Sequence, residues 1–339
     1  MQRIYFLYAG LLLCATLWIG LMQLKRRMLY APHKLRTTDA PLVQTRRPLS
    51  KHFVKTLLGN DLLCTLTCAD AAPDVVLTHG NFGNMYDYSV FFNTLPNLVL
   101  WDYRGYGESS GEPYESLNHW DLHSVIAAKC NQERFWLIGH SLGTNVTLAY
   151  LAAALRHGLP LPEVVVLVHP FLNLADVARH STGSVLMQMV AFLVGDLDQS
   201  RTPLDYLSAK PGSQLYILYS EQDRITPALP VLRALEGTER VHLLNVGGEH
   251  HQVCSNKKIF NALKQVNRKW QTDLPQSQSA HTLRATGVLP VKTGVIDVGQ
   301  AVETVFDAAC IANTIQCHAV DQAPIQQELQ SAEPITSPK

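Results

Sequence analysis

Residues 134–155, RFWLIGHSLGTNVTLAYLAAAL, join a short apolar run to a helical pattern through a tight turn. Gly139 and Gly143 bracket Ser141 in this turn and form the pattern G-x-S-x-G. Side chains at the two glycine positions would collide across the turn. A serine between a strand and a helix in this way has a strained backbone that presents its hydroxyl above the sheet. The stretch therefore predicts a nucleophilic serine at the carboxyl end of a buried strand.

Eight runs of this apolar kind alternate with helical patterns along the chain. The expected strands cover residues 52–57, 61–68, 74–79, 97–103, 134–138, 163–168, 214–219 and 240–246, and the main expected helices cover 116–130, 143–157, 226–236 and 253–270. Short buried strands that alternate with helices indicate a mostly parallel sheet with helices on both faces. We therefore predict an α/β fold with eight strands, whose functional residues follow the carboxyl ends of the strands.

Two regions depart from this alternation. Residues 171–210 stand between two strands and contain a helical apolar stretch at 184–194, which indicates a small cap. From residue 275 the chain becomes rich in Gln, Ser and small residues, with one amphipathic helix expected at 298–313. We predict one domain over residues 28–274, with the cap inside it, and a C-terminal tail over 275–339. One hypothesis for the tail is that its helix binds a partner protein of unknown identity.

A serine hydroxyl is a poor nucleophile until a base, itself oriented by a third group, removes its proton. On this strand–turn–helix pattern the order along the chain is nucleophile, acid and histidine. Asp223 follows the apolar run 214–219, and His250 lies on a glycine-bearing loop after the run 240–246. Ser141, Asp223 and His250 are therefore the expected catalytic residues.

Each of these assignments has a competitor. Glu221 and Asp196 are alternative acids, and His251 is an alternative base because it adjoins His250. The doubled histidine and the nearby Cys254 also resemble part of a metal site, but no matching ligand cluster accompanies them. We expect no metal.

Five stretches carry a resemblance to a known family, and they occur in its order. They are HGNFGN at 79–84, DYRGYGESSGEP at 102–113, GHSLG at 139–143, EQDRITP at 221–227 and GGEHH at 247–251. Over about residues 50–270 the chain resembles the α/β-hydrolases. Among them it is most similar to membrane-anchored, short-capped acyl hydrolases, such as monoacylglycerol lipases, lysophospholipases and depalmitoylase-like proteins.

The resemblance implies a role for each matching residue. Ser141 is the nucleophile, His250 the base, and Asp223 the group that orients the base. The backbone N–H groups of Leu142 and Asn81 form the oxyanion hole. The expected substrate-binding residues are Phe82, His140 and Met187.

The implied reaction is the hydrolysis of an acyl ester or thioester through a covalent acyl-enzyme, with no cofactor. A serine peptidase of the same fold and a non-catalytic binding module remain alternatives. The chain has 28 Lys plus Arg and 28 Asp plus Glu, so its net charge is zero. Nucleic-acid-binding proteins usually carry an excess of basic residues, and we expect no nucleic-acid partner.

The amino-terminal residues 1–27 have the pattern of a membrane anchor. Residues 4–22 contain no charge, and this length is just enough for a helix to cross a bilayer. Lys25, Arg26 and Arg27 follow and predict, by the positive-inside rule, a cytoplasmic catalytic domain. We therefore predict a single-pass transmembrane helix, with a cleaved signal peptide and a helix lying on the bilayer surface as alternatives.

Other polar clusters have a structural interpretation. Asp102, Arg104, Gly105 and Gly107 are expected to shape the loop after the fourth strand rather than to act on a substrate. His119 and His123 stand four residues apart on a predicted helix, and we expect them on its solvated face. Cys64 and Cys68 are expected to be strand residues.

Overall fold

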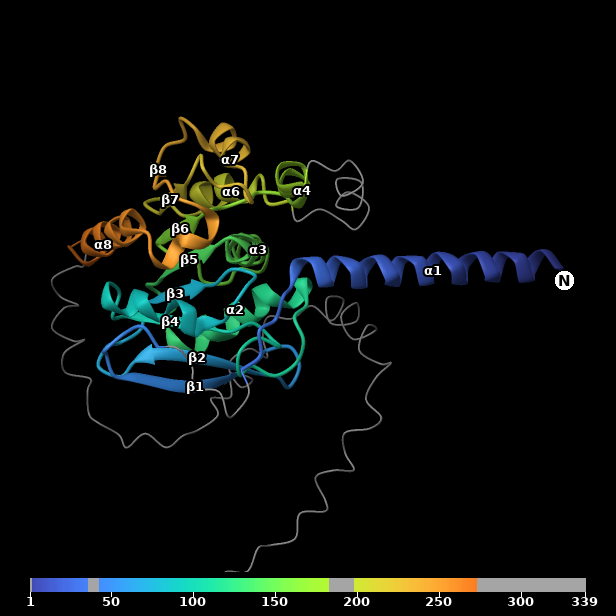
Figure 1. Ribbon diagram of the computed structural model, residues 1–339, viewed down its shortest axis with the longest axis horizontal. Coiled ribbons are helices and arrows are strands. Elements are labelled where there is room, and N and C mark those ends of the chain that lie inside the picture. Colours follow the sequence, from blue (N-terminus) through green and yellow to red (C-terminus); the bar gives the residue numbers. More distant parts are fainter. Residues whose placement is uncertain (1, 36–42, 183–197, 273–339) are drawn as a thin grey trace, which may run out of the picture. The chain divides into compact units, whose positions relative to one another are not determined.

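An eight-stranded sheet lies at the centre of the fold in the computed structural model (Figure 1), which describes residues 2–35, 43–182 and 198–272. The strand order is β1-β2-β4-β3-β5-β6-β7-β8, and only β2 runs antiparallel to its neighbours. The strands are β1 (Leu49–Lys55), β2 (Leu62–Cys68), β3 (Val75–Thr78), β4 (Leu98–Trp101), β5 (Trp136–His140), β6 (Val164–Val168), β7 (Gln214–Tyr219) and β8 (Val241–Asn245). The mixed, mostly parallel sheet confirms the predicted fold class.

The helices divide between the two faces of the sheet. One face packs against α2 (Glu115–Lys129), α3 (Leu142–His157), α6 (Thr202–Ala209) and α7 (Ala228–Leu235). The other packs against the 3-10 helices η1 (Met85–Asn93) and η2 (His250–Cys254) and against α8 (Lys257–Thr272). The described chain also includes α1 (Gln2–Leu29) and α4 (Leu174–Thr182).

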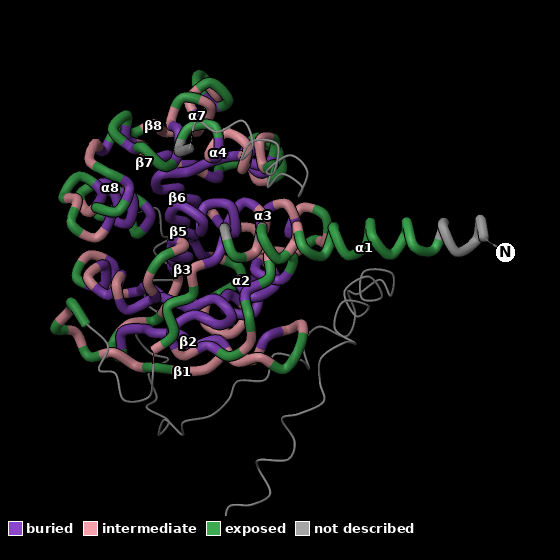
Figure 2. The backbone as a smooth tube through the Cα atoms, turned by 45° about the vertical axis from the view of Figure 1, so that its right-hand side comes forward, coloured by how far each residue is buried: buried purple, intermediate pink, exposed green. Residues whose placement is uncertain are grey.

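The sheet has one apolar layer on each face, because the side chains of a strand point alternately to opposite faces. On β5, Leu137 belongs to the layer that contains α2 and α3, whereas Ile138 belongs to the layer that contains η1 and α8. Both residues are fully buried, as are all residues of β3 and β6, and Figure 2 shows these central strands as buried. Burial on both faces explains why the strands appear in the sequence as continuous apolar runs.

Strand ends shift by a few residues from their predicted positions. The strand expected at 134–138 is β5, Trp136–His140, because its ladder with β6 continues through Gly139 to His140 and Val168. The first strand begins at Leu49 and ends at Lys55, because its ladder with β2 pairs Leu49 with Cys68. The expected strand at 214–219 coincides with β7.

The predicted cap can be followed only at its ends. Its described parts form α4 and α6, and the expected helix at 184–194 lies outside the described residues. The tail over 275–339, with the expected helix at 298–313, also lies outside them.

The amino-terminal stretch does form a helix, α1, with Arg26 and Arg27 in its last turn. However, the parts of the chain that the structure describes contain no helix long and apolar enough to cross a membrane. The predicted transmembrane helix is therefore not supported by the structure.

Candidate active site

Ser141 occupies a sharp turn between β5 and α3, with φ 52° and ψ −117°. An added Cβ at Gly143 would lie 2.0 Å from the carbonyl oxygen of Thr78, and one at Gly139 would lie 2.6 Å from that of Gly143. The Ser141 N–H donates to the carbonyl oxygen of Val168 at the end of β6. The two glycines therefore allow the close approach that holds the serine in this strained backbone, as the sequence predicted.

Three side chains from separate strand ends form a continuous hydrogen-bonded line. The Oγ of Ser141 lies 2.7 Å from Nε2 of His250, and Nδ1 of His250 lies 2.7 Å from Oδ2 of Asp223. A carboxylate only accepts hydrogen bonds, so Nδ1 carries the proton and Nε2 is free to accept from the serine. The arrangement matches a nucleophile, a base and an orienting acid.

The competing residues do not reach this line. The side chain of His251 is 73% exposed and lies 3.5 Å from the carboxylate of Glu249. Glu221 is exposed, whereas Asp223 is buried. Asp196 lies outside the described residues.

The carboxylate of Asp223 accepts more hydrogen bonds than the one from His250. Its Oδ2 accepts from Nδ1 of His169 at 2.8 Å and from Oγ1 of Thr226 at 2.7 Å, and its Oδ1 accepts from the N–H groups of Ile225 and Thr226. Burial by itself raises the pKa of Asp223, but the hydrogen bonds from His169, His250 and Thr226 outweigh it and hold the pKa well below its usual range. Asp223 is therefore charged and can stabilise a protonated His250.

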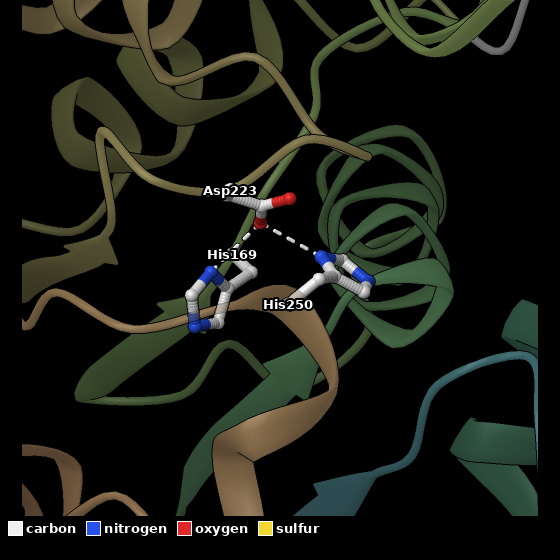
Figure 3. A group of neighbouring side chains, drawn as sticks. All are labelled: His169, Asp223 and His250. Atoms are coloured by element: carbon white, nitrogen blue, oxygen red, sulfur yellow. Dashed lines mark hydrogen bonds and ion pairs between the residues drawn. The ribbon is translucent and has the colours of Figure 1, made fainter.

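The sequence interpretation missed His169. This buried residue follows β6 directly, has a positive φ of 50°, and points its Nδ1 at the same carboxylate oxygen as His250 (Figure 3). Its carbonyl oxygen also accepts from Oγ1 of Thr226. The available signal was its place: it follows the apolar run 163–168, at the sheet edge where functional residues were expected.

His169, Asp223 and His250 also form the one grouping of potential metal ligands found among the described residues. Both Nδ1 atoms lie 2.7–2.8 Å from a single carboxylate oxygen, which is the distance of a charge-assisted hydrogen bond. Two ligand atoms that lie about 2.0–2.2 Å from one tetrahedral zinc ion are about 3.3–3.6 Å from each other, which is longer than either Nδ1–Oδ2 distance here. The geometry is that of two imidazoles sharing an acceptor.

The two predicted oxyanion-hole residues lie next to the serine and next to β3. Leu142 is the first residue of α3, where backbone N–H groups have no partner within the helix. Asn81 is held by its side chain, whose Oδ1 accepts from the N–H of Ala31 at 2.8 Å and lies 3.0 Å from the hydroxyl of Tyr106. The segment that follows α1 therefore braces the predicted oxyanion loop.

The predicted substrate-binding residues have different environments. His140 is buried, its Nδ1 lies 2.8 Å from the hydroxyl of Tyr88, and its ring centroid lies 5.3 Å from that of His250. Burial lowers the pKa of His140 well below its usual value, with a further contribution from His250 and His169, so His140 is neutral. Phe82 is 73% exposed, and Met187 lies outside the described residues.

Other polar residues build the scaffold. Arg104 forms two hydrogen bonds with the carboxylate of Asp121, at 2.8 and 2.7 Å, and also contacts Asp61. An added Cβ at Gly107 would lie 1.9 Å from Oδ2 of Asp102. The structure thus supports the predicted structural role of the 102–107 cluster.

The expectation for His119 and His123 was wrong. His123 is buried and stacks on Tyr150, and His119 is only partly exposed. Burial lowers the pKa of both histidines, to about 4 in His119. The helix face that they share packs against α3, so helical spacing by itself could not distinguish a solvated face from a buried one.

Comparisons with known proteins agree with this geometry. A family model described as the alpha/beta hydrolase fold matches residues 73–173. The protein YfhR of Escherichia coli O157:H7 is 27% identical over 167 residues, which cover 47% of this chain and 55% of YfhR. The lysophosphatidylserine lipase ABHD12 of Gallus gallus is 28% identical over 174 residues, which cover 46% of this chain and 44% of ABHD12.

Among solved structures, the esterase Pf2001 of Pyrococcus furiosus aligns with a TM-score of 0.54 at 15% identity, covering 72% of this chain and 97% of the esterase. This likeness shows a common fold. The chain spans about half the length of the curated relatives that it matches. Together, the turn around Ser141, the hydrogen-bonded line and these matches show the α/β-hydrolase fold and a distant homology to the lysophosphatidylserine lipase ABHD12.

Proposed function

We propose that this protein is a serine hydrolase that cleaves the carboxylic ester or thioester bond of acyl, lipid-like substrates. The observation that carries the proposal is the line of hydrogen bonds from Ser141 Oγ through His250 to Asp223. The similarity to ABHD12 of Gallus gallus, a lysophosphatidylserine lipase, supports the same reaction class.

The reaction proceeds in two halves. Nε2 of His250 takes the proton of Ser141 as Oγ attacks the acyl carbon, and then gives it to the leaving alcohol or thiol as the bond breaks. A water molecule then attacks the acyl-enzyme, with His250 again taking and returning a proton, and the free acid leaves. Asp223 remains ionised throughout and stabilises the imidazolium that forms twice in each cycle.

Negative charge develops on the carbonyl oxygen of the substrate in both halves. The N–H groups of Leu142 and Asn81 are the proposed donors to this oxygen. Each such donor contributes about 3 kcal/mol of transition-state stabilisation in comparable sites. The hydrogen bonds from Ala31 and Tyr106 to Asn81 support this role, because a preorganised donor needs a fixed backbone.

A fluorophosphonate probe tests the proposal, because it reacts covalently with an activated serine. We expect labelling of the wild type and none of Ser141→Ala or His250→Ala. His251→Ala is the matched control, since this neighbouring side chain is exposed and points to Glu249. A folded wild type that resists the probe would favour the non-catalytic alternative. Labelling that is lost in His251→Ala but kept in His250→Ala would identify His251, and not His250, as the base.

The class of scissile bond needs a separate measurement. Esters, thioesters and short peptides with the same acyl group should be compared by kcat/KM. We expect turnover of the esters and thioesters, because an alcohol or thiol leaving group needs less protonation than an amine. Preference for the peptide would support the serine-peptidase alternative.

We also propose that α1 holds the protein at a lipid surface, with the catalytic domain on the cytoplasmic side. In the described part of α1 several large apolar side chains are 54–70% exposed to solvent, among them Leu12, Leu17, Trp18 and Ile19. Exposed apolar side chains of this kind are more stable in contact with lipid than with water. Flotation with phosphatidylcholine vesicles should recover the full chain and lose it when Leu12, Leu17 and Ile19 are replaced by Ser. Equal recovery of both proteins would contradict the proposal.

A further inference from the structure

A groove of about 530 Å³ begins beside the nucleophile and lies between three helices. Leu142, the residue directly after Ser141, belongs to its wall. The groove continues along α3 to Arg156, a distance of 14 residues or about 21 Å of helix. The groove therefore begins next to the proposed active site and extends away from it, while its lining residues include neither Ser141 nor His250.

Each wall of the groove is one face of a helix. The α3 wall contains Leu142, Val146, Ala149 and Ala153, which recur every three or four residues. The opposite wall comes from the last turns of α1, where Met22, Arg26 and Leu29 have the same spacing. The remaining lining comes from residues at the start of α2 and just before α6: Pro113, Tyr114, Glu115, Ser116, Asn118, His119, Asp198 and Gln199. Residues with this spacing share one side of a helix, so each helix turns a continuous strip towards the groove.

Beyond Leu142 and Val146, the strip on α3 is made of alanine side chains. Ala149 and Ala152 are partly exposed in the groove, and the methyl groups leave the space beside the helix open. An apolar chain placed there would lose its contact with water, which is the main source of binding energy for such a chain.

Polar groups near this strip already have partners. Asn118 donates to the hydroxyl of Tyr30 at 2.7 Å, and Arg26 pairs with Glu112 and lies over the ring of Tyr114. Exposed charged residues, Arg156 and Asp198, stand at the open side. The groove thus combines the apolar strip of α3 with polar and charged residues on its other walls, and this mixture suits an amphiphile.

The end of α1 is firmly attached where it forms the wall. Leu29 and Tyr30 are buried in the same apolar layer as α3, and the N–H of Ala31 donates to Asn81. Residues 8–20 of α1 are exposed and mostly apolar. An acyl chain that leaves a lipid surface bound by α1 could therefore stay in contact with apolar side chains until it reaches the groove.

We propose that the groove between α1 and α3 binds the acyl chain of the substrate, with its carbonyl at Ser141 and its tail running along the alanine strip. The inference rests on the proposed esterase function and makes it more specific: the preferred substrates are long-chain esters. It also gives the last turns of α1 a second role, as a wall of the substrate site.

The test narrows the groove with Ala149→Phe, whose ring would project into the space now beside the alanine. The measured quantity is the ratio of kcat/KM for palmitoyl and acetyl esters of 4-nitrophenol, both presented in the same detergent. We expect this ratio to fall by about tenfold or more, because at least two methylene groups lose their apolar contact. Ala149→Val should give an intermediate ratio.

Ala72→Phe is the matched control, because it adds the same ring at an exposed position between β2 and β3. This variant should keep the wild-type ratio of kcat/KM for the palmitoyl and acetyl esters. Circular dichroism and the melting temperature establish that each variant is folded. A graded loss that depends on chain length is not expected from a general folding defect.

Binding is measured in parallel with cis-parinaric acid, a fluorescent long-chain fatty acid. Ala149→Phe should weaken its binding about tenfold, and Ala72→Phe should not. If the wild type hydrolyses both esters and Ala149→Phe changes neither the ratio nor the binding, the groove proposal is wrong and the esterase function stands. If the wild type hydrolyses neither ester, the proposed function fails, and the binding result alone decides for or against the groove.

Discussion

At the scale of single residues, the most informative feature is the sharing of Asp223 by two histidines. His250 and His169 donate to the same carboxylate oxygen from the loops after β8 and β6, the two strands that flank β7. Hydrogen bonds to a charged acceptor are shorter and stronger than neutral ones. His169 therefore helps to hold the carboxylate in the orientation that His250 needs, and within the described residues it makes no hydrogen bond to Ser141.

His169→Ala is expected to lower kcat and to raise the pKa of Asp223 towards its ordinary value, because one donor to Oδ2 is removed. A hydrogen bond to a charged group is worth about 1.5–3 kcal/mol, so the loss in kcat should not exceed about a hundredfold. His169→Asn is the informative control, since asparagine tolerates a positive φ and keeps an N–H donor. Steady-state kinetics should give the highest kcat for the wild type, an intermediate kcat for His169→Asn and the lowest kcat for His169→Ala. Equal kcat in all three would show that His169 is a packing residue.

Gly139 and Gly143, in the sharp turn around Ser141, give a second prediction at this scale. Gly143→Ala should abolish folding or cost at least about 4 kcal/mol, because the new Cβ would lie 2.0 Å from the carbonyl oxygen of Thr78. Gly158→Ala is the control: its φ is also positive, at 66°, but no atom lies within 4 Å of the added Cβ. It should cost only about 1–2 kcal/mol of backbone strain. Soluble expression and chemical denaturation would compare the two, and similar losses would contradict the steric argument.

At the scale of elements, the start of β3 contains a pH-sensitive contact. Asp74 accepts from the side chain of Asn97, which precedes β4, and its N–H donates to the carbonyl oxygen of the same residue at 3.0 Å. Burial raises the pKa of Asp74 to about 7, while the hydrogen bond from Asn97 and the charge of Arg134 act in the opposite direction. The parallel strands β3 and β4 therefore begin beside a carboxyl group that is uncharged below about pH 7.

Asp74→Asn should stabilise the protein relative to wild type as the pH rises. The folded wild type takes up the proton at about pH 7, whereas the unfolded chain does so only near 3.8. Between these values the folded state binds more protons, so the contribution of Asp74 to stability falls with increasing pH. We expect the melting temperature of Asp74→Asn relative to the wild type to be higher at pH 8 than at pH 4, with the gain occurring between about pH 4 and pH 7. A difference that is the same at both pH values would contradict the raised pKa.

At the scale of the whole molecule, the sheet joins two apolar layers into one cooperative unit. Leu137 and Ile138 are neighbours on β5, yet one is buried in each layer. Replacing either residue with Ala should cost about 2–5 kcal/mol, because each side chain leaves a cavity. Since the same strands form the wall of both layers, each variant should still unfold in a single transition.

Urea unfolding followed by tryptophan fluorescence and by circular dichroism tests this expectation. Trp101 reports on one layer, and Trp136 and Trp270 report on the other. Coincident curves for both variants would confirm that the layers unfold together. Two separate transitions would show that each layer is stable without the other.

Much of this molecule could be predicted from the sequence because the sterics of a turn and the spacing of apolar residues depend only on residues that are close together along the chain. The glycines around Ser141, the apolar runs of the eight strands and the order of Ser141, Asp223 and His250 depend on residues within one strand and the loop after it. The choice of His250 over His251 came from a motif, and the geometry of the site agrees with it.

Other features depend on which strands become neighbours, and the sequence contains no local signal for that. His169 and Asp223 are 54 residues apart, and they meet only because β6 pairs with β7. The burial of His123 depends on how α2 packs on α3. The groove beside Leu142 exists only because the last turns of α1 lie opposite α3. The sequence by itself therefore determined the fold class and the three aligned residues, whereas tertiary packing decided what surrounds them, because such contacts depend on strand order and helix docking rather than on neighbours along the chain.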